Sequence, residues 1–237
     1  MRVALGACAR ALLRELGVRV GSYVLQIGQS HAVRADDVPQ AASLLERDAE
    51  ALALLADLTP TRALTPEASQ RLEQAVDDAR SKRDTLGGIV EVVVSGLPVG
   101  LGSYVQADRK LDGRLARALL ATQAVKAVEL GDGWAAASAL GSEVHDPIFL
   151  GTLGLSRPRQ RSGGLEAGVT TGIPLRLRVA MKPIATVPAA LPSVDLQSLT
   201  QTTAHVERSD TCAVPALGVI CEAVVALELA DAAWFEY

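Results

Sequence analysis

Residues 163–188, which read GGLEAGVTTGIPLRLRVAMKPIATVP, constrain the fold of this chain more than any other stretch. Glycines at 163, 164, 168 and 172 allow the backbone to turn sharply and to approach a ligand closely. Apolar and polar residues then alternate from 173 to 180, which predicts a β-strand. Lys182-Pro183 follows the end of that strand. The stretch therefore predicts tight turns that lead into a strand.

Cationic side chains gather in and just before this stretch. Between positions 157 and 182 the only acidic residue is Glu166, and the cationic residues are Arg157, Arg159, Arg161, Arg176, Arg178 and Lys182. The whole chain has a formal net charge of -4. Like charges this close repel one another unless a counter-charge lies among them. The pattern favours a small, strongly anionic ligand; exposed arginines on a loop are the alternative.

Composition excludes several other classes of function. Aromatic residues make up 3% of the chain, so few side chains can stack on bases, and the sequence pI near 5.5 argues against a nucleic-acid partner. The three cysteines are not clustered, which predicts neither a metal site nor a disulfide framework and suits a reducing cytoplasm. The longest charge-free apolar stretch, 92–107, is interrupted by glycine and proline, so we expect no membrane span.

The apolar periodicity predicts both helices and strands, and 237 residues are enough for one large domain or two small ones. Helices are expected at about 3–16, 38–58, 65–83, 111–120 and 215–234. Strands are expected at about 18–27, 88–96, 125–130, 169 and 173–180, with a loop at 31–37 and an irregular basic segment at 145–162. The Gly-x-Gly-x-x-Gly pattern and the Walker loop are absent after these strands, which argues against a Rossmann or P-loop fold.

Two short segments carry groups that could do chemistry. Lys182 at a strand end could bind a phosphate with help from the Thr186 hydroxyl, although a solvated lysine before a turn is the commoner case. Asp210 stands next to Arg208-Ser209, just before the last helix. It suits either an N-cap or near-cap position of that helix or a carboxylate that exchanges a proton with a ligand.

Motifs in one order and spacing along most of the chain resemble the chorismate synthase family. They read RVALGACARALLRELGV, TLGGIVEVVVSGLPVGLGS, PVGLGSYVQADRKLDGRLARALLATQAVKAVELGDGW, GSEVHD, RSGGLEAGVTTGIPLRLRVAMKPIATVP and RSDTCAVPA. The resemblance is weakest between 31 and 80. Several motifs in register are far more specific than a single glycine pattern.

The resemblance implies an α+β protein with a β-α-β sandwich fold, a single domain over residues 1–237 and a homotetramer. It also implies a carbon–oxygen lyase that converts 5-enolpyruvylshikimate 3-phosphate into chorismate by 1,4-anti elimination of phosphate, in the shikimate pathway of aromatic amino acid biosynthesis. Reduced FMN is the expected cofactor, and NADP is associated with the family. The partners implied are thus a phosphorylated small molecule and further copies of the chain.

Carried over residue by residue, the resemblance assigns flavin contacts to Gln123, Ala124, Ala167, Lys182, Pro183, Ile184, Ala185, Thr186 and Arg208. Asp210 falls where the family has its proposed proton acceptor near the flavin N5, and Arg161 falls at a substrate-binding arginine. Ala167 and Ser209 replace a glycine and a histidine that are common in the family.

The family's N-terminal part, with its two catalytic histidines, has no counterpart in this sequence, and none of His31, His145 and His205 maps to their roles. We therefore expect a β-α-β sandwich incomplete at its N-terminus and little or no turnover by this chain alone. A degenerate scaffold that keeps the fold and an assembly surface is the alternative, and an unrelated phosphate-binding enzyme is a third.

Overall fold

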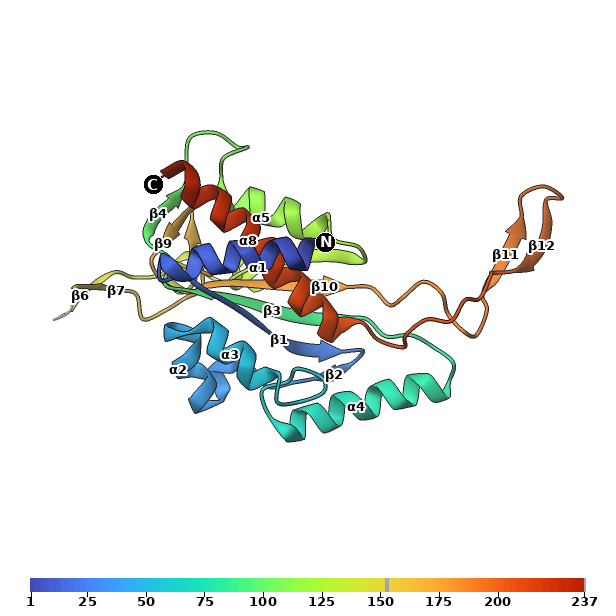
Figure 1. Ribbon diagram of the computed structural model, residues 1–237. Coiled ribbons are helices and arrows are strands. Elements are labelled where there is room, and N and C mark those ends of the chain that lie inside the picture. Colours follow the sequence, from blue (N-terminus) through green and yellow to red (C-terminus); the bar gives the residue numbers. More distant parts are fainter. Residues whose placement is uncertain (152–153, 237) are drawn as a thin grey trace.

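A five-stranded sheet forms the centre of the computed structural model, which describes residues 1–151 and 154–236. Its strands, in spatial order, are β2 (Ser30–His31), β1 (Arg19–Ile27), β3 (Gly88–Ser95), β10 (Leu175–Met181) and β5 (Val125–Leu130). Every neighbouring pair is antiparallel. The strands expected at about 18–27, 88–96, 125–130 and 173–180 are confirmed, and β3 lies between β1 and β10 (Figure 1).

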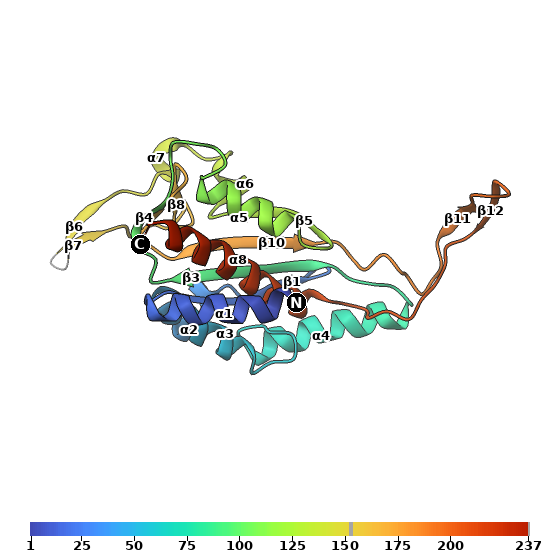
Figure 2. The same cartoon turned by 45° about the horizontal axis from the view of Figure 1, so that its top comes forward.

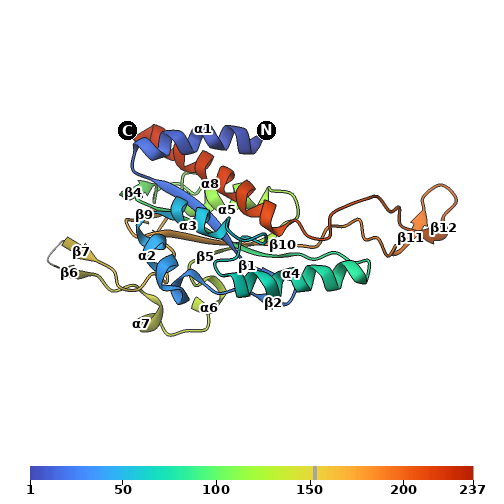
Figure 3. The same cartoon turned by 60° about the horizontal axis from the view of Figure 1, so that its bottom comes forward.

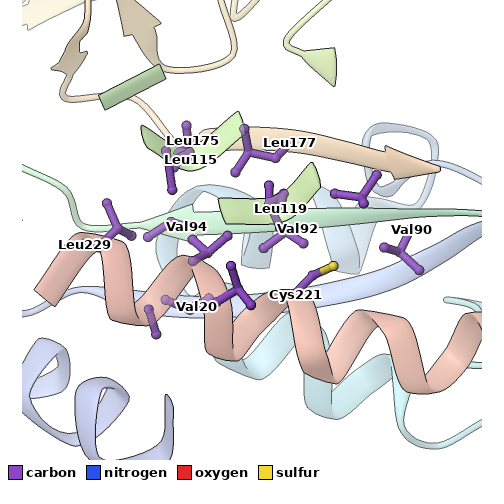
Figure 4. Close-up of a cluster of buried hydrophobic side chains, with 14 of the residues drawn as sticks. Val20, Val90, Val92, Val94, Leu115, Leu119, Leu175, Leu177, Cys221 and Leu229 are labelled. Carbon is purple, nitrogen blue, oxygen red and sulfur yellow. The ribbon is translucent and has the colours of Figure 1, made fainter. Parts of the chain in front are cut away.

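One face of this sheet carries most of the core. Successive side chains of a strand point to opposite faces, so Val90, Val92 and Val94 of β3 share a face, and all three are buried. Leu175 and Leu177 of β10 lie beside them (Figure 4). β-branched side chains suit this pleated, half-enclosed surface.

A layer of three helices covers that face: α1 (Arg2–Glu15), α5 (Leu111–Leu120) and α8 (Val214–Glu236). Figure 2 shows them on one side of β3 and β10. α1 packs along α8, so the two ends of the chain share one layer. On the other side, α2 (Pro39–Arg47) and α3 (Ala49–Ala56) cover the sheet near β1, and α4 (Pro66–Ser81) lies beside β2 (Figure 3).

The helix expected at 38–58 is wrong at its centre, because Asp48 divides it. The Asp48 carboxylate accepts hydrogen bonds from the backbone N–H groups of Glu50 (3.1 Å) and Ala51 (3.0 Å) and so caps α3. The start of α4 is confirmed: the Thr65 hydroxyl accepts the N–H of Ala68 at 3.3 Å, and Pro66 is the first helical residue.

Smaller elements surround this centre. A three-stranded sheet consists of β4 (Val99–Gly102), β9 (Val169–Thr171) and β8 (Leu165–Glu166). Two hairpins consist of β6 (Phe149–Gly151) with β7 (Gly154–Ser156) and β11 (Pro192–Asp195) with β12 (Thr200–Thr203). Three short helices are η1 (Ala35–Asp37), α6 (Gly133–Ala136) and α7 (Gly141–Val144). The β6–β7 hairpin corrects the expectation of an irregular segment at 145–162, of which 152–153 lie outside the described residues.

The β11–β12 hairpin, for which no strand is expected, projects from the body on two extended arms (Figure 1). Its strands are exposed and mostly polar. No helix in the described residues is long and apolar enough to cross a membrane.

Gly21 allows α3 to cross β1 at close range. A Cβ at Gly21 would lie 1.8 Å from the backbone O of Ala49 and 3.0 Å from the Cβ of Ala53. Since backbone cannot yield as a flexible side chain does, we expect Gly21→Ala to displace α3 and to lower the free energy of unfolding by about 3 kcal/mol. Urea unfolding measures this. Gly113→Ala is the matched control, because a Cβ at that position would lie 3.5 Å from its nearest neighbouring atom. We expect no loss of stability from steric overlap in this variant. Equal stability of the two variants would contradict the prediction.

Candidate functional site

Three segments predicted to hold a ligand meet where β10 ends. Lys182 directly follows β10, and its backbone N–H donates to the carbonyl of Ala124 at 3.0 Å. Ala124 lies in the turn between α5 and β5. The register of β10 against β5 therefore places residues 182–186 beside the turn that carries Gln123 and Ala124.

A fourth segment, residues 83–86, holds the other segments in place. The hydroxyl of Thr85, which is buried, donates to the carbonyl of Ile184 at 2.8 Å. The Leu86 N–H donates to the carbonyl of Thr211 at 2.8 Å. The carbonyl of Arg83 accepts the N–H of Ala189 at 2.9 Å. Segment 83–86 thus ties the chain after Lys182 to the chain before α8. This role of Thr85 was not predicted from the sequence, where the one signal is a hydroxyl two residues before Gly87-Gly88.

Residues 208–210 complete this end of the sheet. The Ser209 hydroxyl donates to the carbonyl of Thr186 at 3.0 Å. Arg208 and Asp210 on either side are exposed. The N-cap reading of Asp210 is wrong, because α8 begins four residues later, at Val214. Its carboxylate is therefore available to a ligand.

The expected cationic cluster does not form, because the arginines pair separately with carboxylates or carbonyls of the chain. Their partners are Glu166 for Arg157 (2.9 Å), the Ser142 carbonyl for Arg159 (3.2 Å), Asp132 for Arg161 (3.4 Å), Asp36 and Glu91 for Arg176 (2.8 and 2.9 Å) and Glu129 for Arg178 (2.9 Å). Lys182 has no ion pair within the described ranges and is exposed. Arg159, held by a carbonyl, is exposed as well, so within the described ranges these two of the six cations have no carboxylate partner. Of the two, Lys182 lies where the three segments meet and is free to bind an outside anion there.

Ala167 and Arg161 lie away from this meeting point. Ala167 is in the turn between β8 and β9, where the carbonyl of Gly168 accepts the N–H of Leu111 at 2.9 Å. It therefore lies near the first residue of α5, whereas Ala124 follows the last turn. The ten residues of α5 span about 15 Å. Arg161 lies beside Gly131 and Asp132, near the start of β10.

Two of the expected flavin contacts have unusual backbone. Ala124 (φ 69°) and Ala167 (φ 54°) are in the left-handed region, where a side chain is strained. Such residues cluster at ligand sites, where the surroundings hold the strained backbone in place. Arg83 (φ 57°), in the segment that positions residues 182–189, shares this conformation.

A cavity opens next to Gln123. It has a volume of about 460 Å³ and lies between the start of α1 and the turn after α5. Gln123, Thr122, Arg2 and Ile220 contribute to its lining. An amide and a guanidinium beside apolar groups suit a ligand with both a ring system and polar substituents. Groups of metal-ligating side chains are absent from the part of the chain that the structure describes.

The chain matches known proteins over nearly all its length. The chorismate synthase family model matches residues 1–234. Chorismate synthases from Salinispora tropica, Thermobifida fusca and Chlorobaculum tepidum are 51%, 49% and 48% identical over 98% of this chain. The chain spans 57–58% of the length of these three relatives.

A solved structure gives the same result. A crystal structure of chorismate synthase superposes with a TM-score of 0.80 at 35% identity, covering 99% of this chain and 62% of that one. The match confirms the predicted α+β fold of this type. The motifs, the architecture and these relatives agree, and the chain belongs to the chorismate synthase family.

Proposed function

We propose that this chain supplies part of a chorismate synthase active site. The reaction is the 1,4-anti elimination of phosphate from 5-enolpyruvylshikimate 3-phosphate, which gives chorismate. The match over residues 1–234, to relatives about 50% identical, is the observation that carries the proposal. The convergence of Ala124, residues 182–186 and residues 208–210 at the end of β10 supports it.

The side chains at this end of the sheet suit reduced FMN. Lys182 and Arg208 are exposed cations of the kind that bind a phosphate. The hydroxyls of Thr85 and Ser209 fix the carbonyls of Ile184 and Thr186, so the loop that would hold the cofactor is preorganised. When bound, reduced FMN supplies electron density to the substrate as its allylic C–O bond breaks.

The chain's own groups would bind and move protons. We assign the anionic groups of cofactor and substrate to Lys182, Arg208 and Arg161, with Gln123, Ala124 and Ala167 against the flavin. Asp210 would accept the proton that the substrate loses, at a carboxylate oxygen, and could do so because its side chain is exposed rather than used as a cap. Arg161 and Ala167 would have to meet the other residues along α5 or from a second copy.

FMN binding tests this assignment. We expect the chain to quench the fluorescence of added FMN, and Lys182→Ala to weaken that binding at least tenfold, because a charged contact to phosphate is lost. Lys126→Ala removes an exposed lysine of β5 and should leave binding unchanged. An unchanged FMN affinity in Lys182→Ala would contradict the assigned site. The reaction itself is tested by adding the remaining part of a family member, reduced FMN and the phosphorylated substrate; if no chorismate forms, the proposed reaction is contradicted.

Thr85 gives a second test of the same loop. Thr85→Val removes the hydrogen bond to the Ile184 carbonyl but keeps the side-chain volume, so we expect FMN to bind about five- to tenfold more weakly. Thr85→Ser, which retains a hydroxyl, should recover most of the affinity. Parental FMN affinity in Thr85→Val would rule out a positioning role, and circular dichroism checks that the fold is kept.

We also propose that the chain alone turns over slowly and that the protein is a cytoplasmic homotetramer. Its span of 57–58% of the relatives' length supports the first point. Exposed apolar side chains on α1, at Leu5 and Leu12, and at Leu16 just after it support an assembly surface. Three free cysteines suit a reducing compartment. Light scattering should give four times the 24.7 kDa chain mass, and a monomer would contradict the assembly.

A further inference from the structure

A second cavity, of about 580 Å³, lies on the sheet face opposite α1, α5 and α8; we name it the sheet-face cavity. Its floor includes Ile89, Ala127 and Ala180. These residues alternate along their strands with the core valines at 90 and 179, so they point the other way. The sheet therefore separates this cavity from the one beside Gln123.

The floor is hollow because small side chains meet in register. Ala180 of β10 pairs with Ile89 of β3 on one side and with Ala127 of β5 on the other. These two methyl groups, one on β10 and one on the edge strand β5, leave room that larger side chains would fill. Two residues earlier on β10, Arg178 pairs with Glu129 of β5 at 2.9 Å and closes one end of the floor.

Two walls rise from this floor. Trp134, 83% exposed, forms one of them, and its backbone N–H donates to Glu129 at 2.9 Å. The same carboxylate holds Arg178, so the wall is tied to the floor. The chain around η1 forms the other wall, through Val33, Arg34 and Asp37.

Arg34 is the cation in this cavity whose charge is least satisfied. Its nearest carboxylate is Asp36, at 3.7 Å. Both oxygens of Asp36 already accept hydrogen bonds from Arg176, at 2.9 and 2.8 Å. Arg178, by contrast, is held by Glu129 and also donates to the carbonyl of Gly131. The Asp37 carboxylate also lines the cavity and would repel a second negative charge on a ligand. The cavity therefore suits an anion with a single negative charge.

We propose that the sheet-face cavity binds a planar aromatic molecule with a single carboxylate. Its ring would lie over the alanine floor against the indole of Trp134, and its carboxylate would face the Arg34 guanidinium. An apolar cavity of a few hundred Å³ with few convergent polar groups is typical of small-molecule sites. Ring stacking supplies contact area, and a guanidinium recognises a carboxylate by paired hydrogen bonds. The proposal does not depend on flavin binding.

The fluorescence of Trp134 reports occupancy directly. The chain has two tryptophans, so Trp234→Phe leaves Trp134 as the single emitter. In that background we expect saturable quenching by 4-nitrobenzoate, a planar aromatic monoanion, and weaker quenching by uncharged 4-nitrobenzyl alcohol. Arg34→Gln should weaken 4-nitrobenzoate binding about tenfold. Arg47→Gln, an exposed arginine of α2 outside the cavity lining, should leave it unchanged.

A substitution that fills the floor of the sheet-face cavity provides a second test. Ala127→Leu should abolish saturable quenching, because the added side chain occupies the space of the ring. Linear, non-saturable quenching in the parent, or parental affinity in Arg34→Gln or in folded Ala127→Leu, would overturn the proposal. Quenching that disappears as the protein concentration rises would show that a second copy covers the cavity, which also overturns it. If Ala127→Leu does not fold, Arg34→Gln decides.

Discussion

Replacing Glu222 with alanine is expected to lower the free energy of unfolding by about 3–5 kcal/mol. Glu222 lies on α8 and is 2% exposed. Its carboxylate accepts hydrogen bonds from Ser22 (2.7 Å), Arg62 (3.0 Å) and Arg10 (2.8 Å). One buried side chain thus joins α8 to β1, to α1 and to the loop that carries Arg62. Its removal leaves the Arg62 guanidinium buried with Asp57 as its remaining carboxylate.

Urea unfolding followed by circular dichroism measures this loss. Asp77→Ala is the matched control, because its pair with Arg80 is exposed on both sides and should contribute under 1 kcal/mol. Glu222→Gln keeps the shape and one oxygen acceptor and should fall between the two. If Glu222→Ala does not fold, Glu222→Gln carries the test. A change below about 1 kcal/mol in both variants would mean that the network contributes little.

Arg176→Met is expected to cost a similar amount, about 3–5 kcal/mol. Arg176 is 7% exposed and donates to both oxygens of Asp36 and to Glu91. The Tyr23 hydroxyl also donates to Glu91 and accepts the N–H of Ala35 at 3.1 Å. Burial, with the Glu91 charge, raises the pKa of Tyr23, so this donor stays protonated. Methionine would leave the buried Glu91 carboxylate without its cation.

Arg178→Met is the control for this variant, because it makes the same change two residues along β10. The Arg178 side chain is 23% exposed, and its pair with Glu129 lies closer to water, so we expect a loss of about 1 kcal/mol. Equal losses in the two variants would show that side-chain volume, not the buried charge pair, sets the cost.

The pH dependence of the free energy of unfolding gives an independent test of the Arg176–Asp36 pair. Burial alone raises the pKa of Asp36, but the hydrogen bonds and charge of Arg176 outweigh it, and the pKa is lowered overall. A lowered pKa contributes stability above the pKa of an unfolded aspartate, about 3.9, and this contribution is lost as pH falls through the folded value. The stability gap between parent and Arg176→Met should therefore narrow below about pH 4. A constant gap would exclude Asp36 as the partner that matters.

Local sequence patterns were sufficient for most of the secondary structure. The alternation in β3 and β10 and the Thr65-Pro66 helix start are properties of neighbouring residues, so they can be read without a partner. The helix break at Asp48 could not be predicted, because a single polar residue barely changes the helical pattern of the Ala/Leu-rich segment around it. The strands of the β11–β12 hairpin show neither an apolar alternation nor a tight glycine turn.

Charge partners could not be predicted, because they are distant in sequence. Arg176 and Asp36 are 140 positions apart, and the cationic density around 157–182 therefore indicated a ligand where the chain itself supplies the carboxylates. The convergence of residues 182–186 with 208–210 followed from the family resemblance and not from spacing. The role of the Thr85 hydroxyl follows only from the structure, in which segment 83–86 lies between residues 182–186 and residues 208–211.

The packing of α1 against α8 has a consequence for biosynthesis. The valine-bearing face of the central strands is covered by α8, which follows all of these strands in the chain, and β3 must pair with β10, a strand about ninety positions later. Contacts this distant form slowly, and apolar surface stays open until they do. A chain still on the ribosome would expose that surface to solvent until α8 has been made, so we expect nascent copies to bind chaperones.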